Sequence, residues 1–302
     1  MVPRPRRRSA PVGSDSAAIA PAARERFLRS DRYRVEREWK RYEGTAQRDL
    51  YRVLREHFVK RNLPSPVTWA VDLGSGPGRF TRWLSARGGR AIAFDLSSTA
   101  LRYLAEVWPV GPGAPLPPER VRGDAVAAPF RPGSMGTVLL LGNTLGFAGE
   151  ASTALLRSAE ALVAPAGRLL LEIAPGPGES SRYLTRLPPG SMARLLRAPT
   201  RAVLPRIERE GFRTLPARKA APGPFRRILV STLRAEFADR DWTVLETMAV
   251  APALGPEADR LSMVREDPKA WDGLLAIEQE LGRRPDRWRE AASVLLAVER
   301  KS

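Results

Sequence analysis

The spacing of apolar and polar residues divides the chain into helical and strand-like segments. Between residues 24 and 62, apolar side chains recur every three or four positions, which predicts two amphipathic helices separated near Gly44. The apolar run of residues 67–73 follows Pro64 and Pro66 and has the composition of a buried parallel strand. We therefore expect a helical N-terminal region that leads into a sheet.

Helix and strand patterns then alternate, as is typical of a doubly wound sheet. The expected helices are residues 78–86, 98–107, 151–163, 231–239 and 271–281. The expected strands are residues 91–94, a short strand at Val121, and residues 137–141, 168–173, 243–250 and 292–298. A basic, irregular stretch with helical fragments at residues 192–196 and 203–210 interrupts this alternation.

These patterns predict the domain organisation. Residues 1–23 are rich in proline and arginine and have almost no bulky apolar side chain, so we expect a disordered tail. Residues 24–63 are expected to form a helical cap, and residues 64–302 one α/β domain. Residues 179–225 are expected to be an insertion that covers the sheet as an acceptor-binding cap.

Composition excludes several kinds of chemistry. The chain of 302 residues has no cysteine and one histidine, His57, which excludes disulfides, thiolate nucleophiles and zinc clusters. We expect no metal site, and we expect His57 to be structural or to face solvent. No apolar stretch is long enough to span a membrane or to serve as a signal peptide, so a cytoplasmic protein without membrane contact is expected.

The net charge of +17 has two explanations. Arginine side chains match phosphate oxygens, so the excess could serve phosphate-bearing partners. Alternatively, the preference for arginine over lysine reflects a GC-rich coding sequence. We favour this second explanation because the basic residues are spread along the chain.

A glycine-rich turn carries the strongest chemical information. The segment Val71-Asp72-Leu73-Gly74-Ser75-Gly76-Pro77-Gly78-Arg79-Phe80 places three glycines between a buried strand and an amphipathic helix. Glycine allows a ligand to approach the backbone closely, and the following helix offers unpaired N–H groups. Arg79 stands where a dinucleotide fingerprint needs its third glycine, which disfavours NAD and FAD.

This segment resembles motif I of the class I S-adenosylmethionine-dependent methyltransferases. The resemblance covers about residues 66–173 and implies a Rossmann-like seven-stranded sheet, mostly parallel, with an antiparallel last strand. It implies S-adenosyl-L-methionine as the cofactor. The turn residues implied to bind it are Asp72, Gly74, Ser75, Gly76 and Gly78.

The resemblance implies further cofactor contacts after the next three strands. Asp95 would bind the ribose hydroxyls, and Leu96 would pack against the adenine. Asp124 and Ala125 match the adenine-binding pair. Asn143, at the end of the fourth strand, would hold the methionine portion and face the acceptor.

Purely structural roles stay open for these acids. Asp72 could hold the loop or cap a helix, Asp95 could cap the helix after it, and Asp124 could stabilise a turn. The glycines could mark a tight turn alone.

The acceptor is not identified by the sequence. A methyl transfer mainly needs alignment of the acceptor and exclusion of water, and an amine or carboxylate acceptor needs little acid–base help. The missing thiol excludes cysteine-based pyrimidine methylation, and Gly142-Asn143-Thr144-Leu145 departs from the motif of the adenine N6 enzymes. Asn143 and Tyr42 are the candidates near the acceptor.

Residues outside the sheet could also take part in acceptor binding. Tyr42, Arg48 and Tyr51 could close over the cofactor, although a core role is favoured. The basic residues of the insertion could meet an anionic acceptor or form a solvated face; they include Arg182, Arg186, Arg194 and Arg197.

The leading hypothesis is a methyltransferase for a small molecule. RNA is the alternative acceptor, with the basic tail and insertion as a phosphate platform. A non-catalytic module that keeps the cofactor pocket and a nucleotide-dependent oxidoreductase are the competing classes. The oligomeric state stays open.

Overall fold

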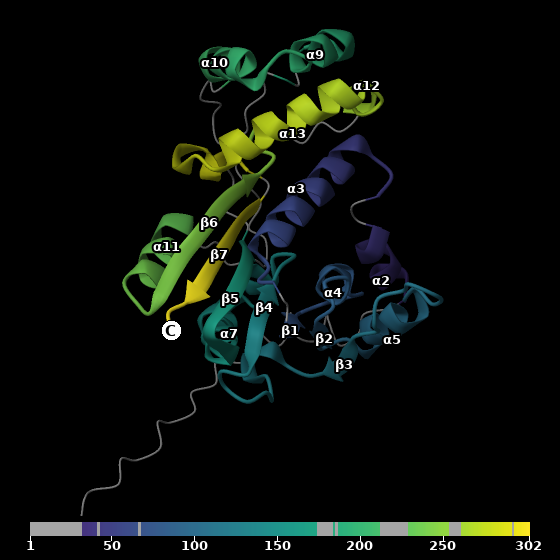
Figure 1. The fold of residues 1–302 in the computed structure, drawn as a ribbon, viewed down its shortest axis with the longest axis vertical. Helices are drawn as coiled ribbons and strands as arrows, with labels where there is room; N and C mark the ends of the chain where they lie inside the picture. The colour runs from purple at the N-terminus through teal and green to yellow at the C-terminus, as the bar shows by residue number, and fades with distance from the viewer. Residues whose placement is uncertain are drawn as a thin grey trace, which may run out of the picture.

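Seven strands form one mixed sheet at the centre of the computed structural model (Figure 1). The structure describes residues 32–40, 43–65, 68–173, 184, 187–211, 229–253, 261–291 and 293–302. The strands are β1 Trp69–Leu73, β2 Arg90–Asp95, β3 Glu119–Arg122, β4 Met135–Leu140, β5 Val163–Ile173, β6 Trp242–Val250 and β7 Ser293–Arg300.

The strand order is β3-β2-β1-β4-β5-β7-β6. All pairs from β3 to β5 are parallel, whereas β7 runs antiparallel to both β5 and β6. This arrangement confirms the predicted Rossmann-like sheet with an antiparallel last strand. The order reverses between β1 and β4, and a crevice forms at such a switch point beyond the carboxyl ends of the strands.

Helices connect and cover these strands. Those before and within the first half of the sheet are α2 Arg32–Trp39, α3 Ala46–Asn62, α4 Arg79–Ser85, α5 Ser98–Glu106, α6 Thr144–Phe147 and α7 Ser152–Leu162. Those that follow β5 are α9 Pro189–Leu196, α10 Thr200–Gly211, α11 Val230–Ala238, α12 Ser262–Arg265 and α13 Pro268–Gly282. Short 3₁₀ turns are η2 Ala125–Ala127, η3 Gly149–Ala151 and η5 Pro285–Glu290.

Local signals explain where several helices begin. Thr45, Ser97 and Asp267 each accept a hydrogen bond from a backbone N–H in the first turn of α3, α5 and α13. Gly44 has a φ of +89° and separates α2 from α3, so the two predicted N-terminal helices are present. The short helices α6 and α12 were not predicted because they have too few residues for a periodic pattern.

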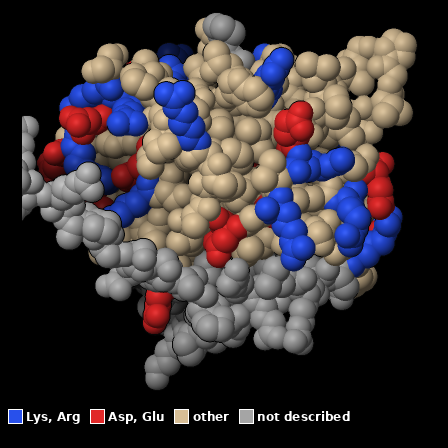
Figure 2. All heavy atoms as spheres, turned by 90° about the horizontal axis from the view of Figure 1, so that it is seen from below, with Lys and Arg blue, Asp and Glu red and all other residues tan. Residues whose placement is uncertain are grey.

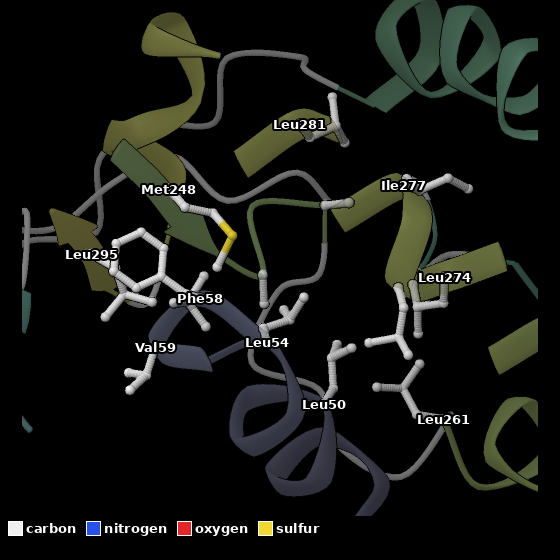
Figure 3. Packing of buried hydrophobic residues seen from close by; sticks show 14 of the residues in the cluster. Leu50, Leu54, Phe58, Val59, Met248, Leu261, Leu274, Ile277, Leu281 and Leu295 are labelled. Atoms are coloured by element: carbon white, nitrogen blue, oxygen red, sulfur yellow. The ribbon is translucent and has the colours of Figure 1, made fainter. Parts of the chain in front are cut away.

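The two faces of the sheet bury separate apolar clusters. One cluster joins the sheet to α3, α4, α9, α10 and α13, and the other joins it to α7 and α11. Leu50, Leu54 and Phe58 of α3 are fully buried and pack in the first cluster with β6, β7 and α13 (Figure 3). Helix α3 is therefore part of the main core.

Helices α9 and α10 form an outer layer over α12 and α13 (Figure 1). A Cβ atom at Gly273 of α13 would overlap the backbone carbonyl oxygen of Leu196 in α9, so the two helix backbones touch. This layer is the described part of the predicted insertion. The proposed boundaries of tail, cap and insertion stay a prediction, and residues 1–31 lie outside the described residues.

Candidate functional site

A pocket lies beyond the carboxyl ends of β1, β2 and β4. Its wall comes from the turns after these three strands, from the segment after β3, from helix α2 and from the segment that runs through α6 into α7. Leu73 pairs with Phe94, and Asp72 pairs with Leu139, so the three strand ends lie at one edge. This is the position at which open α/β sheets bind ligands.

The glycine turn forms the floor of the pocket. Gly74, Gly76 and Gly78 have φ values of +73°, +53° and +81°, which favour glycine. Gly74 and Gly76 line the pocket together with Ser75, whereas Gly78 begins α4 and packs against Leu104. A Cβ atom at Gly78 would overlap the Leu104 side chain, so its role in this structure is close packing.

Asp95 ends β2, as expected, and lines the pocket, whereas its binding to the cofactor ribose stays a prediction. Its Oδ2 atom accepts a hydrogen bond of 2.8 Å from the backbone N–H of Gly76, and Oδ1 accepts one of 2.7 Å from the N–H of Ser97. Burial raises the pKa of Asp95, and these two hydrogen bonds oppose that rise. Ser97, not Asp95, caps α5.

Asp72 lies beneath the turn and does not line the pocket. It is 1% exposed, and its Oδ2 atom accepts a 2.7 Å hydrogen bond from the hydroxyl of Thr81 in α4. Burial raises the pKa of Asp72 to about 7, and the Thr81 hydrogen bond acts in the opposite direction. Its observed contact ties β1 to α4, and direct cofactor binding by Asp72 stays a prediction.

The predicted adenine-binding residues are partly brought together. Leu96 and Ala125 line the pocket. Asp124 does not; its Oδ1 atom accepts a 3.0 Å hydrogen bond from the N–H of Val126 and caps η2. An apolar wall that the sequence analysis missed faces this part of the pocket and consists of Phe94, Phe147, Ala148 and Leu155.

The two candidates for acceptor binding are placed differently. Asn143 has a φ of +62° and begins α6, and its side chain lies where a Cβ atom of Gly146 would be. Its neighbours Gly142 and Thr144 line the pocket, but Asn143 does not. Tyr42 lies outside the described residues. The roles of both side chains stay predictions.

Helix α2 supplies pocket residues that the sequence analysis missed. Arg34, Val35 and Glu38 line the pocket, and Arg79 of α4 donates a hydrogen bond to the backbone carbonyl of Glu38. Val35 also packs against Tyr103 of α5. The amphipathic pattern predicted the helix but could not indicate that its buried side faces the glycine turn.

The remaining candidates lie away from the pocket lining. Tyr51 packs at the margin of the core cluster, and Arg48 donates to the backbone carbonyl of Glu43. His57 is exposed, as expected, with its Nδ1 atom 3.4 Å from the amide nitrogen of Gln279.

The described part of the insertion contributes no residue to the pocket lining. Arg197 instead forms a 2.6 Å ion pair with Asp267, and Arg194 lies near the end of α9. Arg182 and Arg186 lie outside the described residues. The acceptor-binding role of residues 179–225 therefore stays a prediction.

The surface charge does not form a single basic tract on the face seen in Figure 2. Lysine and arginine side chains occur there in separate groups with acidic side chains between them. Among the described residues, many arginines pair with acids; Arg240 with Glu160 is one example, at 2.8 Å. On this face the basic side chains of the described residues are therefore dispersed and do not gather in one tract.

The groups that line the pocket fit an adenosine group linked to an amino acid. A carboxylate at a strand end accepts hydrogen bonds from vicinal hydroxyls, and the apolar wall suits a flat heterocycle. The glycine turn allows close approach of an extended chain. Among the described residues, no group of three or more acidic or histidine side chains could hold a metal ion.

Comparisons with known proteins agree with this geometry. Residues 70–167 match the family described as "Methyltransferase domain". The fold is similar to that of magnesium protoporphyrin IX methyltransferase from Synechocystis with bound S-adenosylmethionine, at 13% identity and a TM-score of 0.50, covering 97% of this chain and 100% of that one. The same enzyme with bound S-adenosylhomocysteine is 15% identical, with a TM-score of 0.50 and coverage of 93% and 99%.

No curated protein sequence matches the chain. Within the part of the chain that the structure describes, no helix is both long enough and apolar enough to cross a membrane.

Proposed function

We propose that the protein is an S-adenosylmethionine-dependent methyltransferase that methylates a small-molecule acceptor, on the premise that residues 70–167 match the family described as "Methyltransferase domain". One observation carries the proposal: the glycine turn, Asp95 and α2 enclose one pocket at the switch point of the sheet. The cytoplasmic location predicted from the sequence is part of this proposal.

Each part of the pocket has a task that its chemistry supports. Asp95 accepts hydrogen bonds from the ribose hydroxyls, and Leu96, Ala125 and Leu155 exclude water around the adenine. The bound cofactor supplies an electrophilic methyl group. The protein's main contribution is to orient the acceptor and keep water out, since reactants held in line and shielded from water react far faster than the same reactants free in solution.

A small acceptor is favoured over RNA by two features. Helix α2 lies over the glycine turn, so the described pocket is walled on that side. The pocket lining balances its two arginines, Arg34 and Arg79, with the acids Glu38 and Asp95, whereas a nucleic-acid platform needs a continuous positive groove.

Calorimetric titration tests the cofactor assignment. We expect S-adenosylmethionine and S-adenosylhomocysteine to bind, and NAD, the control ligand, not to bind. Binding of NAD alone would support the oxidoreductase alternative instead.

Transfer of a labelled methyl group then tests the acceptor class. The protein is incubated with methyl-labelled S-adenosylmethionine and either the low-molecular-mass fraction or the RNA fraction of a cell extract. Label in the low-mass fraction supports the proposal, and label in RNA with steep salt dependence replaces it with the alternative. Cofactor binding without transfer to either fraction supports a non-catalytic module.

A further inference from the structure

A buried ion pair lies directly behind the pocket. Arg55 of α3 and Glu172 of β5 have side chains that are 5% and 2% exposed, and the Arg55 Nη2 atom lies 2.5 Å from Glu172 Oε1. The Arg55 Nε atom donates to the same oxygen at 2.9 Å. Two charges this deeply buried are stable only when their remaining hydrogen-bonding atoms are also satisfied.

The second oxygen of Glu172 reaches the pocket wall. Glu172 Oε2 accepts a 2.9 Å hydrogen bond from the backbone N–H of Gly142, which has a φ of +67° and lines the pocket. This residue begins the turn between β4 and α6. The Glu172 carboxylate therefore holds the backbone of a pocket-lining turn.

The same turn contacts the glycine turn. A Cβ atom at Gly74 would lie 2.5 Å from Cγ2 of Thr144, and Thr144 hydroxyl donates a 2.7 Å hydrogen bond to the carbonyl of Leu141. The side chain of Thr144 thus sits against the Gly74 backbone. A shift of the Gly142 turn would be passed to the floor of the pocket through this contact.

Two further contacts complete the network. Arg55 Nη2 donates to the hydroxyl of Ser293 in β7 at 2.9 Å, and Arg55 Nη1 donates to the carbonyl of Tyr51 at 3.0 Å. Although burial alone would raise the pKa of Glu172, the Arg55 cation and its hydrogen bonds lower it. The carboxylate is consequently charged at neutral pH, and its bond to Gly142 is charge-assisted.

We propose that Arg55 and Glu172 are positioning residues that set the shape of the cofactor pocket through the Gly142 N–H group. This inference rests on the proposed function for its binding readout, since the pocket is taken to hold S-adenosylmethionine. Neither side chain lines the pocket, so the effect is transmitted by the backbone of residues 141–144.

A second ion pair in the same helix provides a matched control. Arg61 of α3 pairs with Glu246 of β6 at 2.6 Å and also joins α3 to the sheet. Neither residue contributes to the pocket lining. Removing this pair weakens the attachment of α3 without touching the Gly142 turn.

The test compares three double variants with the wild type, each lacking one complete ion pair so that no lone charge stays buried. Arg55→Met/Glu172→Met removes the acceptor for Gly142. Arg55→Met/Glu172→Gln keeps an amide oxygen that can accept from Gly142. Arg61→Met/Glu246→Met is the control.

Amide hydrogen exchange in the ligand-free protein is the first readout. We expect Arg55→Met/Glu172→Met to speed exchange at residues 141–144 by about tenfold or more, the factor for one hydrogen bond to a charged acceptor. The control should stay near wild type at these residues, and the Gln variant should lie between the control and the Met variant, because its amide oxygen is a neutral acceptor. Unchanged exchange in the Met variant, or equal acceleration in the control, overturns the inference.

Affinity for S-adenosylhomocysteine is the second readout, measured by calorimetry well below every unfolding midpoint. The Met variant should bind about tenfold more weakly, and the Gln variant should recover most of this loss. If the ion pair only stabilises the fold, its removal will lower the unfolding temperature without changing the affinity for S-adenosylhomocysteine. That result would contradict the inference. If the Met variant does not fold, weak binding by the folded Gln variant contradicts it instead.

The two proposals fail in different ways. Absence of S-adenosylhomocysteine binding by the wild type would reject the proposed function, whereas the exchange at residues 141–144 decides in the ligand-free protein whether the ion pair holds the turn.

Discussion

The Oδ2 atom of Asp95 lies 2.8 Å from the backbone nitrogen of Gly76, so the acid after β2 is bonded to the glycine turn after β1. In the structure this carboxylate fixes the turn, and we propose that it also accepts hydrogen bonds from the ribose. Both roles place it at the junction of two strands at the edge where ligands bind.

Asp95→Ala should weaken S-adenosylmethionine binding by about 1.5 to 3 kcal/mol, because hydrogen bonds to a charged group are lost. Calorimetric titration measures this change, and thermal unfolding checks that the variant is folded. Asp95→Asn is the conservative control, since its amide oxygen retains one acceptor, and it should lose less affinity. Wild-type affinity in a folded Asp95→Ala variant would reject the ribose assignment.

Alanine substitutions at Gly76 and Gly78 should lower the unfolding free energy by different amounts. Gly76 and Gly78 both have positive φ, so replacement by alanine costs roughly 1 kcal/mol of unfolding free energy at either position. A Cβ atom at Gly78 would also overlap Leu104, whereas one at Gly76 meets no atom within 4 Å. Overpacking should add about 1 to 3 kcal/mol to the cost of Gly78→Ala.

Chemical denaturation of the two variants measures this difference. Equal losses of unfolding free energy in Gly76→Ala and Gly78→Ala would show that Leu104 moves aside without cost.

Glu278 should make the stability depend on pH. It is fully buried in α13, its Oε2 atom accepts a 3.0 Å hydrogen bond from the N–H of Ala253, and burial raises its pKa to about 8. A raised pKa means that the folded state binds the proton more tightly than the unfolded state. Its contribution to stability is therefore complete below about pH 4.5 and is lost as the pH rises through about 8.

The glutamine side chain of the Glu278→Gln variant does not titrate, so the variant should not lose this contribution to stability as the pH rises. The unfolding free energy of the variant minus that of the wild type should increase from pH 5 to pH 9 in denaturant titrations. Glu246→Gln is the control: the pKa of Glu246 is lowered, so the difference should stay flat over this range. A flat difference for Glu278→Gln as well would mean that its pKa is near the ordinary value.

Contact between α9 and α13 should depend on Gly273. A Cβ atom at this position would overlap the Leu196 carbonyl oxygen, so Gly273→Ala should force the two helices apart. The unfolding free energy should fall by about 1 to 3 kcal/mol. Gly190→Ala in α9 is the control, because no atom lies within 4 Å of the added Cβ atom. Affinity for S-adenosylhomocysteine should be unchanged, since no described residue of α9 or α10 lines the pocket.

Thermal unfolding measures the loss of stability, and calorimetry measures the affinity for S-adenosylhomocysteine. Weaker cofactor binding by a folded Gly273→Ala variant would mean that the outer helices support the pocket from a distance.

The sheet and the glycine turn were predictable because their signals are local. Alternating strand and helix patterns predicted the strands of the sheet, and the glycines of residues 74–78 predicted a turn that a ligand can approach, whereas Asp95 was added by the resemblance to a known family. Such signals lie within a few residues of the structure they determine. The resemblance to a known family then supplied the direction of the last strand.

The other pocket residues depend on contacts between distant segments. Arg34 and Glu38 line the pocket because α2 packs on α5, and no local pattern specifies that partner. Glu172 carried a weaker signal that was missed: it is an acid within the otherwise apolar run of residues 169–173, and a buried acid needs a partner. Its partner Arg55 lies 117 residues earlier, a distance that spacing rules do not cover.

The contact between Arg55 and Ser293 joins positions 238 residues apart in the chain. Helix α3 is synthesised long before β7, which completes its environment. During translation the Arg55 cation and the apolar face of α3 therefore lack their final partners until β7 has been synthesised. A topology with such distant contacts folds slowly, and the apolar surface of this half of the sheet stays exposed until β7 inserts between β5 and β6.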